Sequence, residues 1–110
     1  MRKKAESDEY GRQMRSPKEY VTLDMTWSKG GFDSVMIANF TIKSTLQFQV
    51  RDISIRCAGF GNGGTQLTRI DRTLYEIVPA KTTKRFNNVN MGFIPSQMTQ
   101  ANCTVVEVER

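Results

Sequence analysis

Two cysteines, Cys57 and Cys103, are the residues whose chemistry this sequence indicates most directly. Cys57 shares its strand parity with Ile53 and Ile55, and Cys103 shares its parity with Val105, so both thiols are expected to point inward. Inward cysteines on facing or neighbouring strands can form a disulfide, which we favour over two buried thiols acting as small hydrophobes. Such a bond would stabilise the fold by about 3–4 kcal/mol. It would also indicate an extracytoplasmic location, whereas unbonded cysteines would indicate the cytoplasm.

Metal and acid–base chemistry have few residues to use in this chain. The sequence contains no histidine, which excludes Ser-His-Asp and Cys-His arrangements, and its two cysteines lack the paired spacing of zinc motifs. Asp71 and Glu76 are expected on opposite sides of a strand, and Asp24 and Asp52 at solvent-facing positions. We interpret all four as surface charges and therefore predict no metal site, no cofactor, no catalytic residue and no enzymatic activity.

A glycine-rich segment, Gly59–Gly64, formally matches the phosphate-binding pattern G-x-G-x-x-G. In dinucleotide-binding folds this pattern opens a helix whose backbone amides hold the pyrophosphate, but residues 65–68 begin no convincing helix here. Glycines also suit tight turns because they adopt positive φ without steric cost. The segment is therefore interpreted as a turn between two strands.

Two aromatic side chains are the best candidates for an exposed contact surface. Phe60 lies among the turn glycines, and Tyr75 has the parity opposite to that of Leu74, which is expected in the core. Two arginines are near them in the sequence. The contact patch that we hypothesise consists of Phe60, Arg69, Arg72 and Tyr75.

The charge of the chain suggests an alternative partner. Its formal net charge is +5 and its pI is about 9.5, and basic residues that neutralise phosphates promote nucleic-acid binding. The basic residues are dispersed, however, and the only compact group is Lys81, Lys84 and Arg85. A solvated surface explains this distribution at least as well, so nucleic-acid binding is held as the second interpretation.

The elements that must position these residues are expected to be strands. From Tyr20 onward apolar and polar residues alternate with a period of two, as in residues 21–28 and 36–43, which is typical of strands with one buried face. A slip of parity at Arg51-Asp52 predicts a bulge or a bend. Residues 70–78 fit both a helix and a strand, and we favour the strand.

About seven short strands are expected, with residues 81–86 and 88–93 counted as two of them. Seven short strands separated by turns predict an all-β, immunoglobulin-like antiparallel β-sandwich, with a small β-barrel as the alternative. Residues 19–110 form this domain, and residues 1–18 are expected to be a flexible polar leader in which a short helix would find little to pack against.

Membrane and targeting segments are not predicted in this chain. The longest apolar stretches are only a few residues long, whereas a membrane-spanning helix needs about 18. Residues 1–4 are basic, as at the start of a secretory signal, but the apolar stretch that should follow is absent. A signal or anchor lost from the start of the protein stays open as an alternative.

The order of these features resembles that of the FxLYD-type domains, a bacterial family. The resemblance runs through residues 39–44 and 50–55, the aromatic and glycine turn at 60–64, and residues 79–83 before Phe86. It implies a small immunoglobulin-like sandwich in the periplasm or cell envelope, often a lipoprotein or membrane-anchored, that makes contacts and carries no catalytic residues.

Three functions are therefore expected in a definite order. The first is a non-catalytic extracytoplasmic interaction or accessory module whose partner is a protein. The second is a nucleic-acid-binding small barrel that uses Lys81, Lys84 and Arg85 with exposed aromatic residues. The third is a structural subunit of a larger assembly, in which an edge strand pairs with a neighbour.

Overall fold

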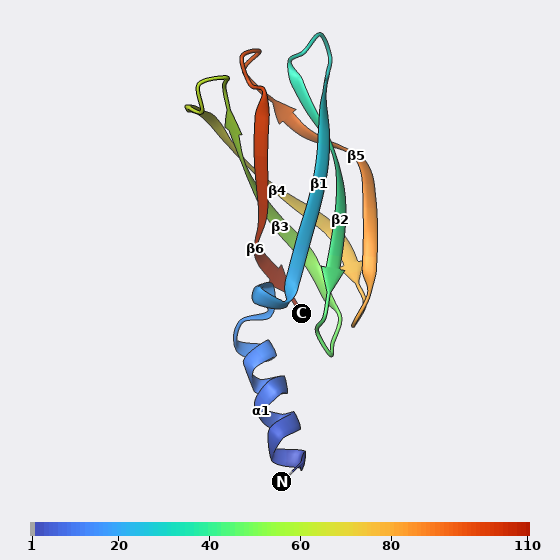
Figure 1. The fold of residues 1–110 in the computed structure, drawn as a ribbon. Helices are drawn as coiled ribbons and strands as arrows, with labels where there is room; N and C mark the ends of the chain where they lie inside the picture. Colours follow the sequence, from blue (N-terminus) through green and yellow to red (C-terminus); the bar gives the residue numbers. More distant parts are fainter. Residues whose placement is uncertain (1) are drawn as a thin grey trace.

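The computed structural model describes the backbone of residues 2–110 and the side chains of residues 8–110. One helix and one short 3-10 turn precede six strands (Figure 1). The elements are α1 (Arg2–Arg15), η1 (Pro17–Tyr20), β1 (Val21–Gly30), β2 (Val35–Ser44), β3 (Val50–Phe60), β4 (Gln66–Val78), β5 (Thr83–Phe93) and β6 (Gln100–Glu109).

The strands form two antiparallel sheets of three strands each. One sheet has the order β1-β2-β5 and the other has the order β4-β3-β6, so β2 and β3 are the central strands. The sheets pack face to face, with β1 beside β6 along one seam and β5 beside β4 along the other (Figure 1). Because the ladders do not close on each other, the prediction of an all-β antiparallel sandwich is confirmed and the barrel alternative is not.

The described chain has six strands rather than the seven expected, because the segments 81–86 and 88–93, predicted as two strands, belong to one continuous strand. β5 runs without a break through residues 83–93. Asn88 has a φ of 58°, and the pairing of β5 with β2 shifts register beside it. Asn39 on β2 holds this bulge, since its Oδ1 accepts a hydrogen bond of 2.9 Å from the backbone N–H of Asn88. The change of parity that looks like a strand end in the sequence is therefore a bulge.

The second parity slip lies where the sequence predicts it. Asp52 has a φ of 53°, and the pairing of β3 with β4 shifts register between Arg51 and Ile53. Val50 before this shift and Ile53 after it are both fully buried, so the shift lets residues of opposite parity on β3 face the core. The predicted bulge and the predicted strand over residues 70–78 are both confirmed.

The core lies between the two sheets, where the central strands β2 and β3 face each other. Among the described residues, every buried side-chain N or O atom has a hydrogen-bond partner. Alternate residues of both central strands point inward, which is the period that the sequence shows. The largest fully buried apolar side chains are Phe40, Met36, Ile42, Leu46, Ile53, Ile55, Met98, Val50 and Val78. Burial of such side chains contributes about 1.5–3 kcal/mol each.

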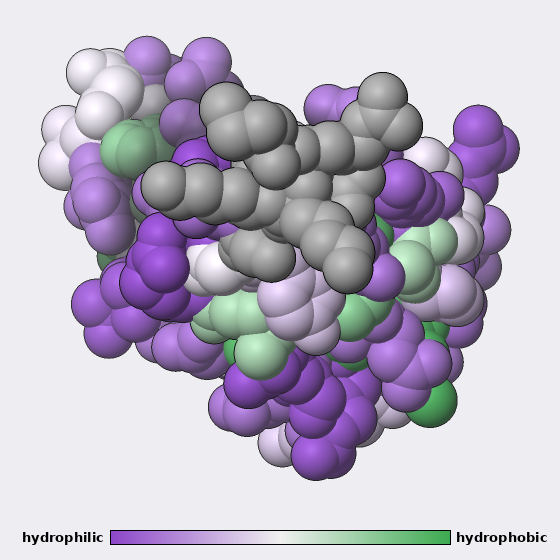
Figure 2. All heavy atoms as spheres, turned by 90° about the horizontal axis from the view of Figure 1, so that it is seen from below, coloured by the Kyte–Doolittle hydropathy of each residue, from purple (hydrophilic) through white to green (hydrophobic). Residues whose placement is uncertain are grey.

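Helix α1 projects from the base of the sandwich, close to the C-terminus (Figure 1). It makes more contacts than the sequence suggests. Gln13 is buried and its Oε1 accepts a 2.8 Å hydrogen bond from the backbone N–H of Gln47, while Tyr10 packs edge-to-face on Phe48. The second half of the helix is therefore docked on the loop between β2 and β3. Seen from the helix end, the base is mostly hydrophilic with smaller hydrophobic areas (Figure 2).

Candidate functional site

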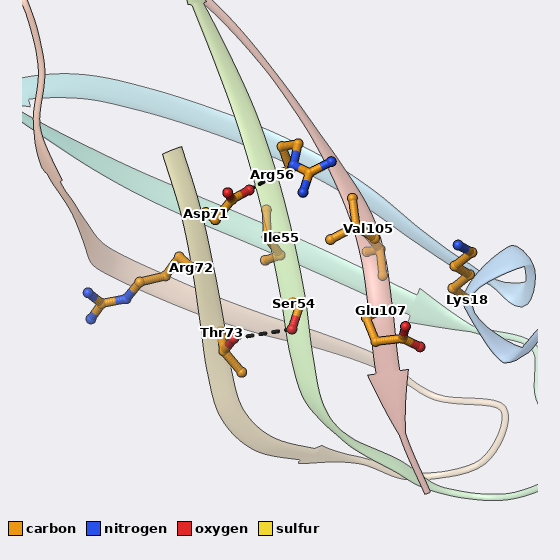
Figure 3. Close-up of a pocket in the computed structure, with 10 residues that line it drawn as sticks. Lys18, Ser54, Ile55, Arg56, Asp71, Arg72, Thr73, Val105 and Glu107 are labelled. Carbon is orange, nitrogen blue, oxygen red and sulfur yellow. Dashed lines mark hydrogen bonds and ion pairs between the residues drawn. The ribbon is translucent and has the colours of Figure 1, made fainter. Parts of the chain in front are cut away.

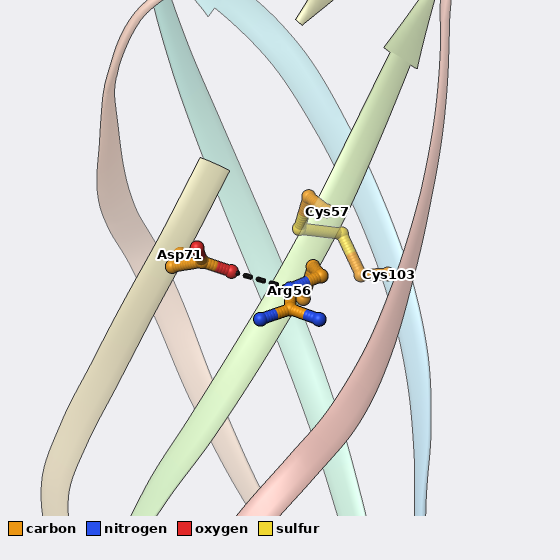
Figure 4. Close-up of a disulfide and its surroundings, with 4 residues drawn as sticks. All are labelled: Arg56, Cys57, Asp71 and Cys103. Atoms are coloured by element: carbon orange, nitrogen blue, oxygen red, sulfur yellow. Dashed lines mark hydrogen bonds and ion pairs between the residues drawn. A yellow bond between two sulfur atoms is a disulfide. The ribbon is translucent and has the colours of Figure 1, made fainter. Parts of the chain in front are cut away.

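The predicted pair of cysteines is bonded. Cys57 on β3 and Cys103 on β6 lie directly opposite each other, with their sulfur atoms 2.01 Å apart and their Cα atoms 4.0 Å apart (Figure 4). The bond joins neighbouring strands of one sheet, whereas the characteristic disulfide of antibody domains crosses the core between the two sheets. It therefore fixes the edge strand β6 to the central strand β3.

The hypothesised contact patch is divided by the structure. Phe60 pairs with Gln66 at the first residue of β4, and Tyr75 follows nine residues later, about 30 Å away at 3.3 Å per residue. Arg69 points to the outer face and forms an ion pair with Asp71 at 3.5 Å. The four residues therefore do not form one surface, because they are distributed along the whole length of a strand and over both of its faces.

The outer face of the β4-β3-β6 sheet carries a shallow groove of about 620 Å³ that is lined by paired polar side chains (Figure 3). Arg56 donates a 2.8 Å hydrogen bond to Asp71 across the ladder, and the hydroxyls of Ser54 and Thr73 lie 3.1 Å apart. The hydrogen bond from Arg56 lowers the pKa of Asp71, and the positive charges of Arg56 and Arg69 lower it further. The charged residues that line this groove are Lys18, Arg56 and Arg72 against Asp71 and Glu107, so most of its charge is compensated.

The seam between β4 and β5 differs, because two cations occupy positions that point toward the core. Arg72 pairs with Ile55, and Lys84 pairs with Ile42, and both isoleucines are buried. Directly opposed residues of an antiparallel pair lie on the same face of the sheet. Arg72 and Lys84 therefore start from inner positions of two edge strands. Figure 3 shows Arg72 extending from β4 on the side away from β3, which is toward the open edge.

Lys84 connects the two sheets across this seam. Its Nζ donates a 2.9 Å hydrogen bond to the backbone carbonyl of Ile77 on β4. The same Nζ lies 5.5 Å from the centroid of the Phe86 ring, a distance at which a cation is attracted by an aromatic face. The lysine thus covers one end of the β4 edge.

The seam holds a groove of about 620 Å³ with an excess of positive charge. Its charged residues are Arg72, Lys84 and Arg85 against Glu76 alone, and Tyr75 beside them is 79% exposed. Neither Arg72 nor Lys84 forms an ion pair with the side chains that the structure describes. The groove therefore joins half of the hypothesised contact patch to two of the three residues of the compact basic group.

The end of the sandwich that lies away from helix α1 exposes aromatic side chains that were not predicted from the sequence (Figure 1). Phe32 lies in the turn between β1 and β2 with a φ of 60° and a fully exposed ring, and Phe93 is 83% exposed at the end of β5. Phe93 pairs with Val35, next to that turn. An aromatic residue beside Gly30 and Gly31 is the signal that drew attention to Phe60, and it applies equally to Phe32.

The described residues include neither a metal-binding cluster nor a membrane-spanning helix. Among the described residues no group of three or more histidine, cysteine, aspartate or glutamate side chains is placed to hold a metal ion. None of the helices in the described part of the chain has the length and apolar character that a membrane crossing requires.

The glycine segment forms a turn, in which Gly64 has a φ of 81°, and strand β4 follows it.

Comparison with family models, with curated proteins and with solved structures finds no match to this chain. The function is therefore inferred from its own residues, of which those lining the β4–β5 seam are the candidate site.

Proposed function

We propose that this chain is a non-catalytic interaction module of the bacterial cell envelope, as the resemblance to FxLYD-type domains implies, and that it contacts a protein partner through the β4–β5 seam. The Cys57–Cys103 bond is the observation that carries the location outside the cytoplasm. Disulfides persist in oxidising compartments and are rare where glutathione and thioredoxin keep thiols reduced.

The seam supports a role in binding because its cations Arg72 and Lys84 form no ion pair with the described side chains. Arg72 at an inner position and the exposed Tyr75 gain little for folding, yet arginine and tyrosine are residues that interfaces use. Arginine and tyrosine are also enriched among the residues that dominate binding energies. The paired charges around Asp71 on the outer face offer a partner less, because they already satisfy each other.

The location is tested by counting thiols in the protein taken from its host. The protein is denatured without reductant and treated with an alkylating reagent, separately for envelope and cytoplasmic fractions. No alkylated cysteine in monomeric protein from the envelope fraction supports the proposal. Two alkylated cysteines, or protein found only in the cytoplasm, would contradict it.

The contact surface is tested with a photo-cross-linking amino acid placed at Tyr75, inside the seam. The matched control places it at Thr22, an exposed residue on the outer face of β1. We expect a discrete cross-linked protein from position 75 in living cells and none from position 22. Equal cross-linking from both positions, or none from either, would contradict binding through the seam.

Nucleic-acid binding is the second candidate, and the same groove favours it. Arg72, Lys84 and Arg85 could neutralise about three phosphates, which predicts a log–log salt slope of about −2 for single strands. A titration with a fluorescent single-stranded oligonucleotide at two salt concentrations measures this slope. Weak binding without that salt dependence removes the second candidate.

A further inference from the structure

We infer that the β4–β5 seam binds an extended acidic peptide segment, which adds as a strand along the open edge of β4. This inference rests on the proposed interaction function and specifies its partner. It depends on three features of the seam: an unpaired backbone edge, a defined end to that edge, and positive charge at inner positions.

Two open backbone edges, those of β4 and β5, border the seam. β4 pairs only with β3, and β5 pairs only with β2, so both strands that border the seam are edge strands within the described chain. An edge strand presents a row of N–H and C=O groups that an extended peptide can pair with. β4 has 13 residues, the longest of the six strands, and therefore offers the longer edge.

The hydrogen bond from Lys84 sets one end of the available edge. Its Nζ occupies the carbonyl of Ile77, so an added strand would end before that residue. The groove is lined by residues 72–76 of β4 and by residues 84–87 and 89 of β5. A peptide of about five residues in extended conformation, at 3.3 Å per residue, would cover this length.

The positive charges of the seam determine which side chains a bound peptide should carry. Arg72 and Lys84 begin at inner positions, and the exposed Arg72 and the half-buried Lys84 both line the groove at the open edge, where they attract an opposite charge. Alternate side chains of an added strand face the same side as Arg72. Carboxylates at every second position would therefore meet the two cations, and Arg85 at the rim would add to this attraction.

Two contacts favour a peptide over a nucleic acid at this site. Glu76 lies in the lining, where it would repel a continuous phosphate backbone but only one side chain of a peptide. The Phe86 ring, the aromatic residue nearest the core in this groove, already has Lys84 over its face, which competes with base stacking. The unpaired edge of β4, in contrast, matches the hydrogen-bonding pattern of a peptide.

The test uses the full chain and a fluorescent eight-residue peptide that alternates glutamate with threonine. We expect saturable binding, and the double variant Arg72→Gln/Lys84→Gln should bind at least about tenfold more weakly because two charge pairs are lost. The matched control is Lys43→Gln/Arg69→Gln, which removes two cations from the outer faces and should change the affinity less than about twofold. Circular dichroism and the melting temperature show whether each variant is folded.

Two peptide controls separate strand addition from simple charge attraction. A version methylated on alternate backbone nitrogens keeps its charge but cannot complete the ladder, so it should bind at least about tenfold more weakly. Hydrogen exchange on the unmodified protein provides a readout without any variant. The bound peptide should slow exchange of amides in residues 72–76 and leave those of β1 and β6 unchanged.

Several results would overturn the inference. These are no binding at millimolar peptide, equal binding of a lysine–threonine peptide, equal loss in both double variants, or protection of β1 or β6 instead of β4. Binding of a single-stranded oligonucleotide but not of the peptide would favour the second candidate function. If cross-linking from position 75 and the thiol count succeed while the peptide fails, the interaction module stands and only its acidic-peptide partner is wrong.

Discussion

The two seams of the sandwich are built from strands of similar length, yet their inner positions differ in kind. Along β1 and β6 most of these positions are apolar and partly buried, and the cation Lys29 lies only near the end of β1, opposite the buried Met36. The apolar residues are Leu23, Met25, Trp27, Ala101, Cys103 and Val105. Along β4 and β5, Arg72 and Lys84 interrupt the apolar series. The apolar core therefore extends along most of the β1–β6 seam, whereas charged side chains interrupt it at the β4–β5 seam.

The two seams also differ in the bonds that fix their edge strands. β6 is fixed to β3 by the Cys57–Cys103 bond, whose sulfur atoms lie on the inner face. The described contacts of the β4–β5 seam include one hydrogen bond between the sheets, from Lys84 to Ile77. The comparison indicates that a sandwich can use one pair of edges for stability and keep the other pair for binding.

The largest effect is expected from removing the disulfide with Cys57→Ser/Cys103→Ser. The free energy of unfolding should fall by about 2–4 kcal/mol, because the unfolded chain regains the entropy that the cross-link removes. Urea denaturation measures it. The unmodified protein in reductant should show a similar loss, and a change below about 1 kcal/mol would mean that the apolar seam holds without the bond.

The next effect distinguishes the seams directly. Trp27→Ala removes a large, partly buried side chain from the β1–β6 seam and should cost about 2–3 kcal/mol. Tyr75→Ala in the β4–β5 seam should change the free energy of unfolding by less than about 0.5 kcal/mol, because the side chain is 79% exposed. Equal losses, measured by thermal or urea unfolding, would remove the distinction between a stabilising seam and a binding seam.

A smaller effect is expected from Lys84→Met, which keeps the apolar stem and removes the charge. The variant should lose about 0.5–1.5 kcal/mol, since the Ile77 carbonyl loses its donor and the Phe86 ring loses its cation. Lys43→Met, on the outer face of β2, is the control and should stay within about 0.5 kcal/mol. A stabilised Lys84→Met would show that the lysine is kept at the seam for binding rather than for folding.

The smallest effect concerns pH and the outer face of β4. The pKa of Asp71 is lowered in the folded state by the hydrogen bond from Arg56, so its contribution to stability is present above its unfolded pKa. That contribution is lost as the pH falls through the lowered value. Asp71→Asn should therefore flatten the acid limb of the stability curve, measured by urea unfolding between neutral and acidic pH. A curve that is unchanged in shape would show that the pair is too exposed to contribute.

The alternation of apolar and polar residues was enough to predict most of the strands, because successive side chains of a strand point to opposite faces. It failed only at the Asn88 bulge, where one strand looked like two. The sequence also located the bulge at Asp52 and the glycine turn, since each depends on a few neighbouring residues. It identified Cys57 and Cys103 as a pair, because these are its two cysteines and both have inward parity.

The choice of neighbouring strands, and of the edges that stay open, became visible only in the folded chain. Strand pairing is a long-range choice, so the sequence could not show that the disulfide lies within one sheet or that Phe60 and Tyr75 are far apart. The inner position of Lys84 depends on the bulge at Asn88, which Asn39 stabilises from another strand. Arg72 and Lys84 therefore came together at one seam through the packing of two sheets, which no local pattern encodes.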